Sequence, residues 1–481
     1  MTAEDLSDRW ILWLRERDAP ATAQRRSLWE RRKAELVPGA AMTGSVSLKA
    51  SQGAGAVRPG HPVVAVAERD LVRRIVDERD VHIEFSPVKD VRRDQVVAFE
   101  AHACGPRGPL RMPDRLFAAA AAAGVAGQLD WIVRAAAFRD ALKKNLPPAV
   151  SLFVTVQPDS LIMPCPEDLL ETIWEASVEL RIFIDIPGRS LSRSPYQVLE
   201  TARRGRAAGW GIVVQGLEHS GRGIAMLPAL EPDIVKIDQN VLTTYSGLAA
   251  GAVTAALAEI EHGGAALLVQ NVADEPGRRV GRFTGAAYQS GPLMGPPAQL
   301  PAGLGVPMAP VARHDRVPGR TPWDTLADHE AHTVTHVRRD EVDNLVRPFI
   351  AQAMAAEPTP LIALMLPDAL ASMQPQTVLM LQMLMERSVL SLVLGRDVGT
   401  LPDWPARAAD LPGGHPLVGQ FCFAALSPTR SMVLVTKRDG SRDATVDLAV
   451  SHDPAATREI VRYVLELLDT LPGGIRYLPP G

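Results

Sequence analysis

A chain of 481 residues is longer than one ordinary domain, and its 46% hydrophobic and 22% charged residues are typical of globular protein. Its net charge of -4, with acidic and basic residues interspersed, argues against nucleic acid as a partner. Cys104, Cys165 and Cys422 lack disulfide or metal spacing, and the N-terminus has neither signal peptide nor membrane span, so we expect a cytoplasmic protein without a membrane partner.

Residues 1–36 predict an N-terminal helical segment, because Leu6, Trp10 and Trp13 fall on one helical face. This apolar stripe either folds back on the body of the protein or packs against a second copy or a partner. Residues 37–62 are rich in Gly, Ser, Ala and Pro without periodicity and predict a flexible linker.

Residues 63–300 begin with a further helix, after which short β-type runs alternate with helical stretches. The runs are VHIEF, VVAFEA, VSLFVTV, LRIFIDI, GIVVQ, DIVKID, ALLVQ and a last one near Tyr288. This alternation predicts βα units with parallel strands. About eight units indicate a closed barrel, although an open doubly wound sheet would show the same periodicity.

Residues 301–325 are again rich in Pro and Gly and predict a second linker. Residues 326–481 then predict one separate α+β domain. Its expected elements are helices near 340–354, 376–386 and 454–468 and the strands LIALMLP, SVLSLVLG, QFCFAALS, SMVLVTKRD and ATVDLAVSH.

The order of motifs in residues 63–300 resembles the EAL family of cyclic di-GMP phosphodiesterases. The segments that carry the resemblance are EFSPV at 84–88, VVAFEAH at 96–102, PDRLF at 113–117, LDWIV at 129–133, FVTVQP at 153–158, FIDIPG at 183–188, VVQGLE at 213–218, DIVKIDQNV at 233–241, LLVQNVA at 267–273 and SGPLMGPP at 290–297. The resemblance implies an α/β fold with an EAL-type (β/α)8 TIM-like barrel and a site at the carboxyl ends of its strands.

The resemblance also implies two divalent cations, and most of the family's ligand positions have changed here. Glu100 and Asp185 keep a carboxylate and Lys236 keeps the lysine. The changed positions are Thr155 for an asparagine, Gln215 and Gly216 for the paired aspartates, Gln270 and Ala273 for two glutamates, and Ser290 for a glutamine. Neutral side chains compete poorly with water for Mg²⁺. We therefore expect no metal and no cofactor in the barrel.

The phosphate contacts that the resemblance implies have changed as well. Cys104 stands where the family has an arginine, and a thiol cannot pair bidentately with phosphate. For the vestigial pocket of Glu100, Asp185 and Lys236 we expect a buried lysine paired with one of the two acids, and no catalytic residue.

Residues 340–470 resemble the DICT domain, a sensory module of bacterial signalling proteins. The segments that carry this resemblance are SVLSLVLG, FCFAALSPTRSMVLVTKRDG and ATVDLAVSHDPAATREIVRYVLELL. The resemblance implies a sensory or protein-binding role.

His329, His332 and His336 are spaced so that a helix would place them on one face. Three imidazoles on one face can bind a metal ion. The neighbouring Thr-Val-Thr sequence disfavours a helix, so a solvated cluster near the linker is the competing interpretation.

These observations favour a bacterial, non-catalytic signalling protein in which a degenerate EAL barrel acts as a binding or regulatory scaffold. A protein partner and a homodimer are the expected associations. Two alternatives remain open: an effector that binds cyclic di-GMP or another nucleotide without hydrolysing it, and a residual cyclic di-GMP phosphodiesterase.

Overall fold

The protein is described here by a computed structural model. It describes residues 66–471, with gaps at 158–159, 161–162, 244–246, 302, 305–309, 314–319, 330, 367–372, 397, 399–403, 419 and 439–444, and also residues 476–478. The expected N-terminal segment 1–36 and linker 37–62 lie outside the described residues. The chain divides into two compact units: Met1–Glu84, His102–Leu146 and Met163–Leu180 form the first, and Phe85–Ala101, Pro147–Ile162 and Arg181–Gly481 form the second.

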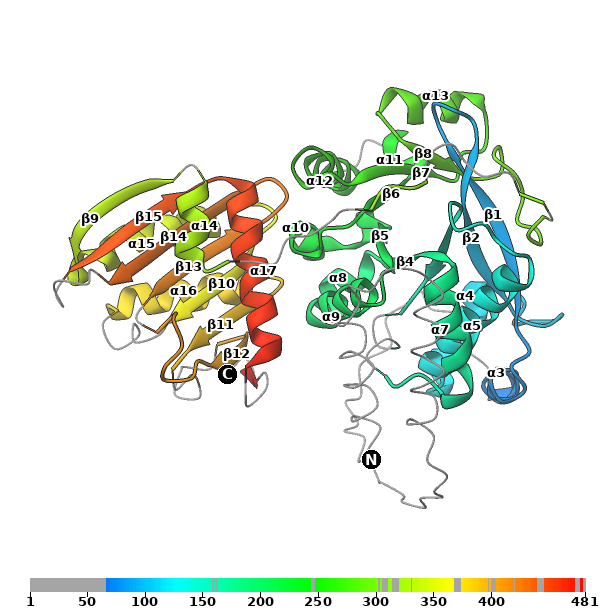
Figure 1. Ribbon diagram of the computed structural model, residues 1–481, viewed down its shortest axis with the longest axis horizontal. Coiled ribbons are helices and arrows are strands. Elements are labelled where there is room, and N and C mark those ends of the chain that lie inside the picture. The colour runs from blue at the N-terminus through cyan, green and yellow to red at the C-terminus, as the bar shows by residue number, and fades with distance from the viewer. Residues whose placement is uncertain are drawn as a thin grey trace, which may run out of the picture. The chain divides into compact units, whose positions relative to one another are not determined.

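Eight strands close into a barrel in the order of the sequence (Figure 1). They are β1 (His82–Asp90), β2 (Val96–Cys104), β3 (Ser151–Thr155), β4 (Arg181–Pro187), β5 (Gly211–Gln215), β6 (Ile234–Asp238), β7 (Ala266–Gln270) and β8 (Tyr288–Ser290). Their β-branched and aliphatic residues are almost all buried, as expected for parallel strands covered on both faces. The closed barrel confirms the expected α/β fold class.

One strand departs from the expected parallel arrangement. The pairs from β2 to β8 are parallel, whereas β1 runs antiparallel to β8, with Val88 opposite Ser290. The reason is the short connection to β2, in which the Asp90 N–H donates to the Gln95 carbonyl at 2.9 Å. A parallel crossover needs about a dozen residues, so this connection can only make a hairpin.

Helices of the second unit follow the barrel strands. They are α8 (Arg189–Arg193), α9 (Pro195–Ala207), α10 (Leu227–Leu230), α11 (Gln239–Thr243), α12 (Gly247–Gly263) and α13 (Glu275–Phe283), with the 3₁₀ turns η2 (Leu217–His219) and η3 (Gly221–Met226). The first unit holds α3 (Val66–Glu78), α4 (Pro113–Ala123), α5 (Ala126–Lys143), η1 (Glu167–Leu169) and α7 (Leu170–Glu179). Val72, Ile75, Leu116 and Leu129 form a hydrophobic core within that first unit.

Part of the segment expected to be a linker, 301–325, belongs to the barrel. Val311 is fully buried in the barrel core, and its carbonyl accepts a hydrogen bond from Arg181. Arg313 donates to the Gly209 and Ile182 carbonyls near the first residues of β4 and β5. The side chains of Arg181 and Arg313 thus connect residues 311–313 to the barrel through backbone carbonyls.

The C-terminal domain contains a mixed sheet of eight strands in the order β16-β12-β11-β10-β13-β14-β15-β9. The strands are β9 (His332–Arg338), β10 (Leu361–Leu366), β11 (Ser391–Gly395), β12 (Ala406–Asp410), β13 (Phe421–Leu426), β14 (Ser431–Arg438), β15 (Thr445–Ser451) and β16 (Arg476–Leu478). Its helices are α14 (Pro322–Asp328), α15 (Arg339–Met354), α16 (Pro375–Arg387) and α17 (Pro454–Thr470). The expected helices and strands are present, and α14, β9, β12 and β16 are additional.

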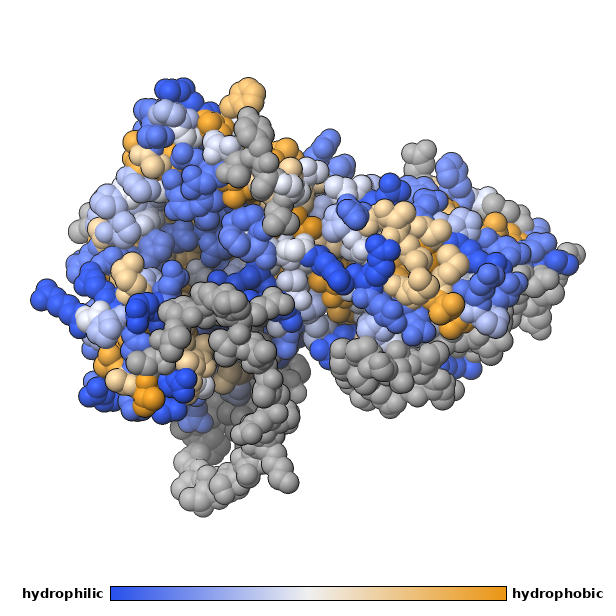
Figure 2. All heavy atoms as spheres, turned by 180° about the vertical axis from the view of Figure 1, so that it is seen from behind, coloured by the Kyte–Doolittle hydropathy of each residue, from blue (hydrophilic) through white to orange (hydrophobic). Residues whose placement is uncertain are grey.

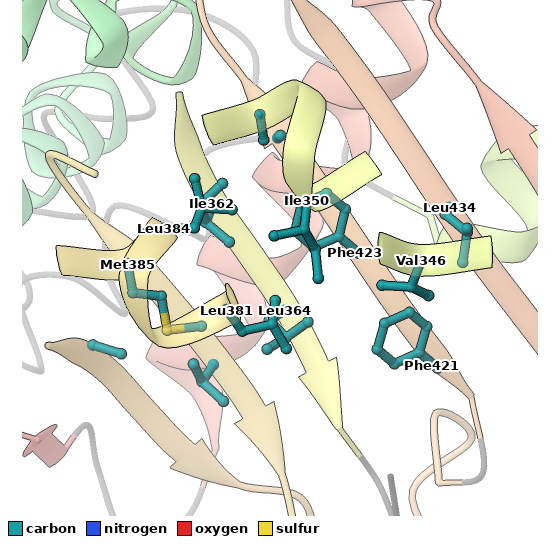
Figure 3. Packing of buried hydrophobic residues seen from close by; sticks show 14 of the residues in the cluster. Val346, Ile350, Ile362, Leu364, Leu381, Leu384, Met385, Phe421, Phe423 and Leu434 are labelled. Carbon is teal, nitrogen blue, oxygen red and sulfur yellow. The ribbon is translucent and has the colours of Figure 1, made fainter. Parts of the chain in front are cut away.

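Alternate residues of the sheet pack against helices on its two faces. On one face Val346 and Ile350 of α15 and Leu381 of α16 join the strand residues Leu364 and Phe423 in a buried cluster (Figure 3). On the other face α17 contacts β11, β13 and β14 with its buried apolar residues, which are Ile460, Val461, Val464 and Leu468. The domain is therefore a helix–sheet–helix sandwich.

Hydrophobic residues also reach the surface over α15 and α16. Leu345, Leu379 and Met383 are 41%, 56% and 45% exposed, and Figure 2 shows hydrophobic residues gathered on this domain. Within the described parts of the chain, no helix combines the length and the apolar character needed to cross a membrane.

Candidate functional site

The interior of the barrel is built in two layers, because alternate residues of each strand point inward. The lower layer is apolar and contains Ala98, Phe153, Phe183, Val213, Ile234, Leu268 and Tyr288. Two residues further along each strand, the upper layer is formed by Glu100, Thr155, Asp185, Gln215, Lys236, Gln270 and Ser290. The register of the strands thus gathers the positions singled out in the sequence at the carboxyl end of the barrel.

Lys236 forms the centre of this polar layer. Its ammonium Nζ lies 2.9 Å from Glu100 Oε1 and donates a hydrogen bond to Asp185 Oδ2. Lys236 is completely buried, and the side chains of Asp185 and Glu100 are 1% and 12% exposed. Below them the Phe153 ring centroid lies 5.4 Å from the ammonium. The expected lysine–acid pairing is confirmed, and it involves both acids.

The charges in this cluster are unbalanced, since two carboxylates share one ammonium group. The pKa of Asp185 is raised to about 6, because burial and repulsion from Glu100, which raise it, outweigh the attraction of Lys236, which lowers it. Burial by itself lowers the pKa of Lys236, but attraction to Asp185 and Glu100 outweighs it, so the pKa of this lysine lies above its ordinary value. The lysine therefore stays charged, and Asp185 is the group of this cluster that takes up a proton at mildly acidic pH.

The second oxygen of Asp185, Oδ1, is buried and has no hydrogen-bond partner among the described residues. An ionised carboxylate oxygen without a partner is costly in an apolar surrounding. The raised pKa of this group reduces that cost, because the protonated form carries no charge.

The residues of the upper layer do not fit the pair of divalent cations that an EAL site would hold. Glu100 and Asp185 are the carboxylates of this layer, and both contact Lys236. Gln215 ends β5, and Gly216 follows it in a left-handed conformation with a φ of 65°. Gln270 and Ala273 at and after the end of β7 add no anionic oxygen. Mg²⁺ requires such oxygens to replace its bound water.

Cys104, at the end of β2, lies in the first unit together with Glu84. It is half-buried, and burial followed by repulsion from Glu84 raises the pKa of its thiol. A neutral thiol gives no ionic contact to phosphate. Arg111 of the same unit pairs with Glu84 at 3.3 Å.

The helical arrangement of His329, His332 and His336 is wrong, because His332 begins strand β9 and His336 lies within it. Both are exposed. His329 follows α14, and its Nδ1 lies 2.7 Å from Asp453 Oδ2. The strand forms because the alternating Thr and Val residues pair with β15. Among the residues that the structure describes, no group of His, Cys, Asp and Glu is arranged to hold a metal ion.

Sequence reasoning missed one buried pair. Arg458 of α17 and Glu259 of α12 form a double hydrogen bond at 2.9 Å and 2.9 Å. Their positions are 199 residues apart, and no local pattern connects them. Glu259 is a charged residue in a helix that is rich in alanine, and this is the signal that could have drawn attention to it.

The chain is similar to one known protein family and to several solved structures. The family model of the EAL domain matches residues 68–297 of this chain. A comparison with curated proteins finds no match. Among solved structures, the EAL domain of Xanthomonas citri FimX in complex with c-diGMP is similar at 15% identity and a TM-score of 0.41, over 50% of this chain and 96% of that one.

Two further structures show comparable likeness. The EAL domain of Pseudomonas aeruginosa FimX bound to c-di-GMP has 19% identity and a TM-score of 0.41, over 48% of this chain and 97% of that one. The Klebsiella pneumoniae BlrP1 complex with manganese and cy-diGMP has 21% identity and a TM-score of 0.39, over 46% of this chain and 56% of that one. On the match to the family model, the chain contains an EAL domain, over residues 68–297.

Proposed function

We propose that this EAL domain does not hydrolyse cyclic di-GMP and instead acts as a binding or regulatory scaffold in a bacterial signalling pathway. The observation that carries the proposal is the set of neutral residues at the ends of β5 and β7, where Gln215, Gly216 and Gln270 stand. Two-metal hydrolysis needs cations that clamp the attacking and the leaving oxygen. With Gln215 and Gly216 at the end of β5, the anionic oxygens for such a clamp are missing from this chain.

The C-terminal domain, residues 326–481, is in this proposal a DICT-like sensory module that binds a protein partner. Its exposed hydrophobic residues on α15 and α16 support a partner-binding role, because contiguous apolar surface is typical of interaction sites.

The first prediction tests this function directly. Purified full-length protein, incubated with cyclic di-GMP and Mg²⁺ or Mn²⁺, is expected to give no linear dinucleotide by chromatography. A product that depends on the metal and is lost in Glu100→Gln would contradict the proposal and establish a residual phosphodiesterase.

A binding measurement on the same preparation separates the scaffold from a nucleotide effector. Cys104 offers no charge to a phosphate, so calorimetry is expected to show weak binding of cyclic di-GMP or none. A micromolar or tighter dissociation constant for cyclic di-GMP, without hydrolysis, would contradict the scaffold function. It would show that the protein is an effector that binds the nucleotide.

A further inference from the structure

Within the second unit, helix α17 of the C-terminal domain contacts barrel helices through charged residues. The Arg458 guanidinium binds the Glu259 carboxylate of α12 with both of its terminal nitrogens, and Nη1 also lies 3.4 Å from the Pro228 carbonyl of α10. The Glu259 side chain is 0% exposed and that of Arg458 is 7% exposed. This pair is shielded from solvent, unlike an ordinary surface salt bridge.

A second arginine repeats the contact one turn later on α17. Arg462 donates to both carboxylate oxygens of Glu231, the residue that follows α10. The Glu231 carbonyl accepts in turn from Arg206 at 2.9 Å. Arg458 and Arg462 therefore project from one face of α17 onto two acidic residues, Glu259 and Glu231.

A glycine on α12 leaves the space that the Arg458–Glu259 pair occupies. Gly263 lies one turn after Glu259 on α12, and a Cβ at this position would come within 2.0 Å of Glu259 Oε1 and 3.0 Å of Arg458 Nη1. A larger residue at this position would displace the carboxylate from the guanidinium. The α12 surface is thus shaped for the pair.

Other arginines of the second unit make polar contacts nearby. Arg313 donates to the Ile182 carbonyl of the barrel, and Arg320 donates to Glu459 of α17 at 3.2 Å. Two further contacts, the Arg222 bond to the Arg387 carbonyl and the Arg407 cation–π contact with Tyr196, lie in the same unit.

We infer that the α10–α12 surface of the barrel is an interaction surface whose partner is the chain's own helix α17, held by the charge-specific Arg458–Glu259 and Arg462–Glu231 pairs. Glu231 and Glu259 precede β6 and β7, the strands that carry Lys236 and Gln270. The C-terminal domain thereby stabilises locally the elements that hold the polar layer of the barrel. This inference stands on the contacts and is independent of whether the barrel hydrolyses a nucleotide.

The second prediction tests this surface with hydrogen exchange of the full-length chain. Glu259→Arg places two guanidinium groups in a shielded position, so exchange in peptides from α10, α12 and α17 should accelerate on the order of a hundredfold. The double exchange Glu259→Arg with Arg458→Glu restores opposite charges and should recover most of the protection. Glu275→Arg on α13, where the side chain is 55% exposed, is the matched control and should change nothing in those peptides.

Unchanged exchange in Glu259→Arg would overturn the inference, and so would a double variant that recovers nothing. Exchange in β13 and β14 shows whether a variant has folded. If the reversal unfolds the whole chain, Glu259→Gln keeps the shape and removes the charge. Faster exchange confined to α10, α12 and α17 then supports the surface, and uniform exchange across the chain contradicts it.

Discussion

Lys236 and Arg458 are both buried cations, yet the two regions balance their charge differently. Lys236 faces two carboxylates in the barrel, those of Glu100 and Asp185. Arg458 faces one carboxylate, and each of its terminal nitrogens has its own oxygen of Glu259. The barrel cluster therefore carries an excess negative charge when fully ionised, and the α17 pair carries none.

The difference shows what each arrangement is suited to. A bidentate, charge-matched pair fixes orientation, which is what a contact between two domains requires. A cluster with excess carboxylate leaves an oxygen, Asp185 Oδ1, without a hydrogen bond and keeps a group with a raised pKa. Raised pKa values of buried carboxylates gather at functional sites, so this cluster is the candidate for one.

The third prediction has the largest expected effect on stability. Lys236→Met removes the ammonium group that contacts both Glu100 and Asp185, and breaking a buried pair in this way costs about 3–5 kcal/mol. Thermal melting should show a decrease of several degrees. Lys143→Met, at an exposed position on α5, is the control and should leave the melting temperature almost unchanged.

If uncompensated negative charge causes the loss of stability in Lys236→Met, removing one carboxylate should restore part of it. Adding Asp185→Asn to Lys236→Met removes one of the two uncompensated carboxylates, so the double variant should be more stable than Lys236→Met alone. If the double variant instead loses as much stability as the two single variants together, packing and not charge determines the stability of this layer.

The barrel could be predicted from the sequence because its strands are short β-branched and aliphatic runs separated by helical patterns. Period-two alternation then gathers Glu100, Asp185 and Lys236 once the strands are aligned. Sequence alone did not show that Lys236 contacts both acids, since the side-chain distances depend on strand register. It also did not show the antiparallel β1, although the short link between Asp90 and Val96 contained that information.

The C-terminal domain was harder to predict at its edges. Strand β12, with the sequence ARAAD, is rich in alanine and gives little β signal. Strand β9 contains His332 and His336, whose spacing fits a helix as well as a strand. Its pairing with β15 decided between the two, and such long-range contacts cannot be obtained from a local pattern.

The fourth prediction uses pH to sharpen the comparison. The pKa of Asp185 is raised from 3.8 to about 6 in the folded protein, so the folded state binds more protons than the unfolded state between these values. This residue therefore stabilises the protein at low pH, and its contribution is lost as pH rises through about 6. The free energy of unfolding of the wild type minus that of Asp185→Asn should decrease over this range and stay level above pH 7.

Urea denaturation of both proteins at several pH values measures this difference. A difference that rises with pH would mean that the attraction of Lys236 exceeds the cost of burial and that the carboxylate is favoured throughout. A difference that does not vary would remove Asp185 as the titrating group of the cluster.

The fifth prediction has the smallest expected effect and tests whether the upper layer of the barrel binds a metal ion. A ligand at a hundred times its dissociation constant adds about 2.7 kcal/mol to stability, which would raise the melting temperature by a few degrees. Because Lys236 already neutralises Glu100 or Asp185, millimolar Mg²⁺, Mn²⁺ or Ca²⁺ should change the melting temperature by less than about one degree relative to EDTA. A rise of several degrees that Glu100→Gln abolishes would show that a cation still binds the upper layer, and the scaffold proposal would lose its support. A rise that His332→Ala abolishes would instead locate the cation at strand β9 and leave the argument about the barrel intact.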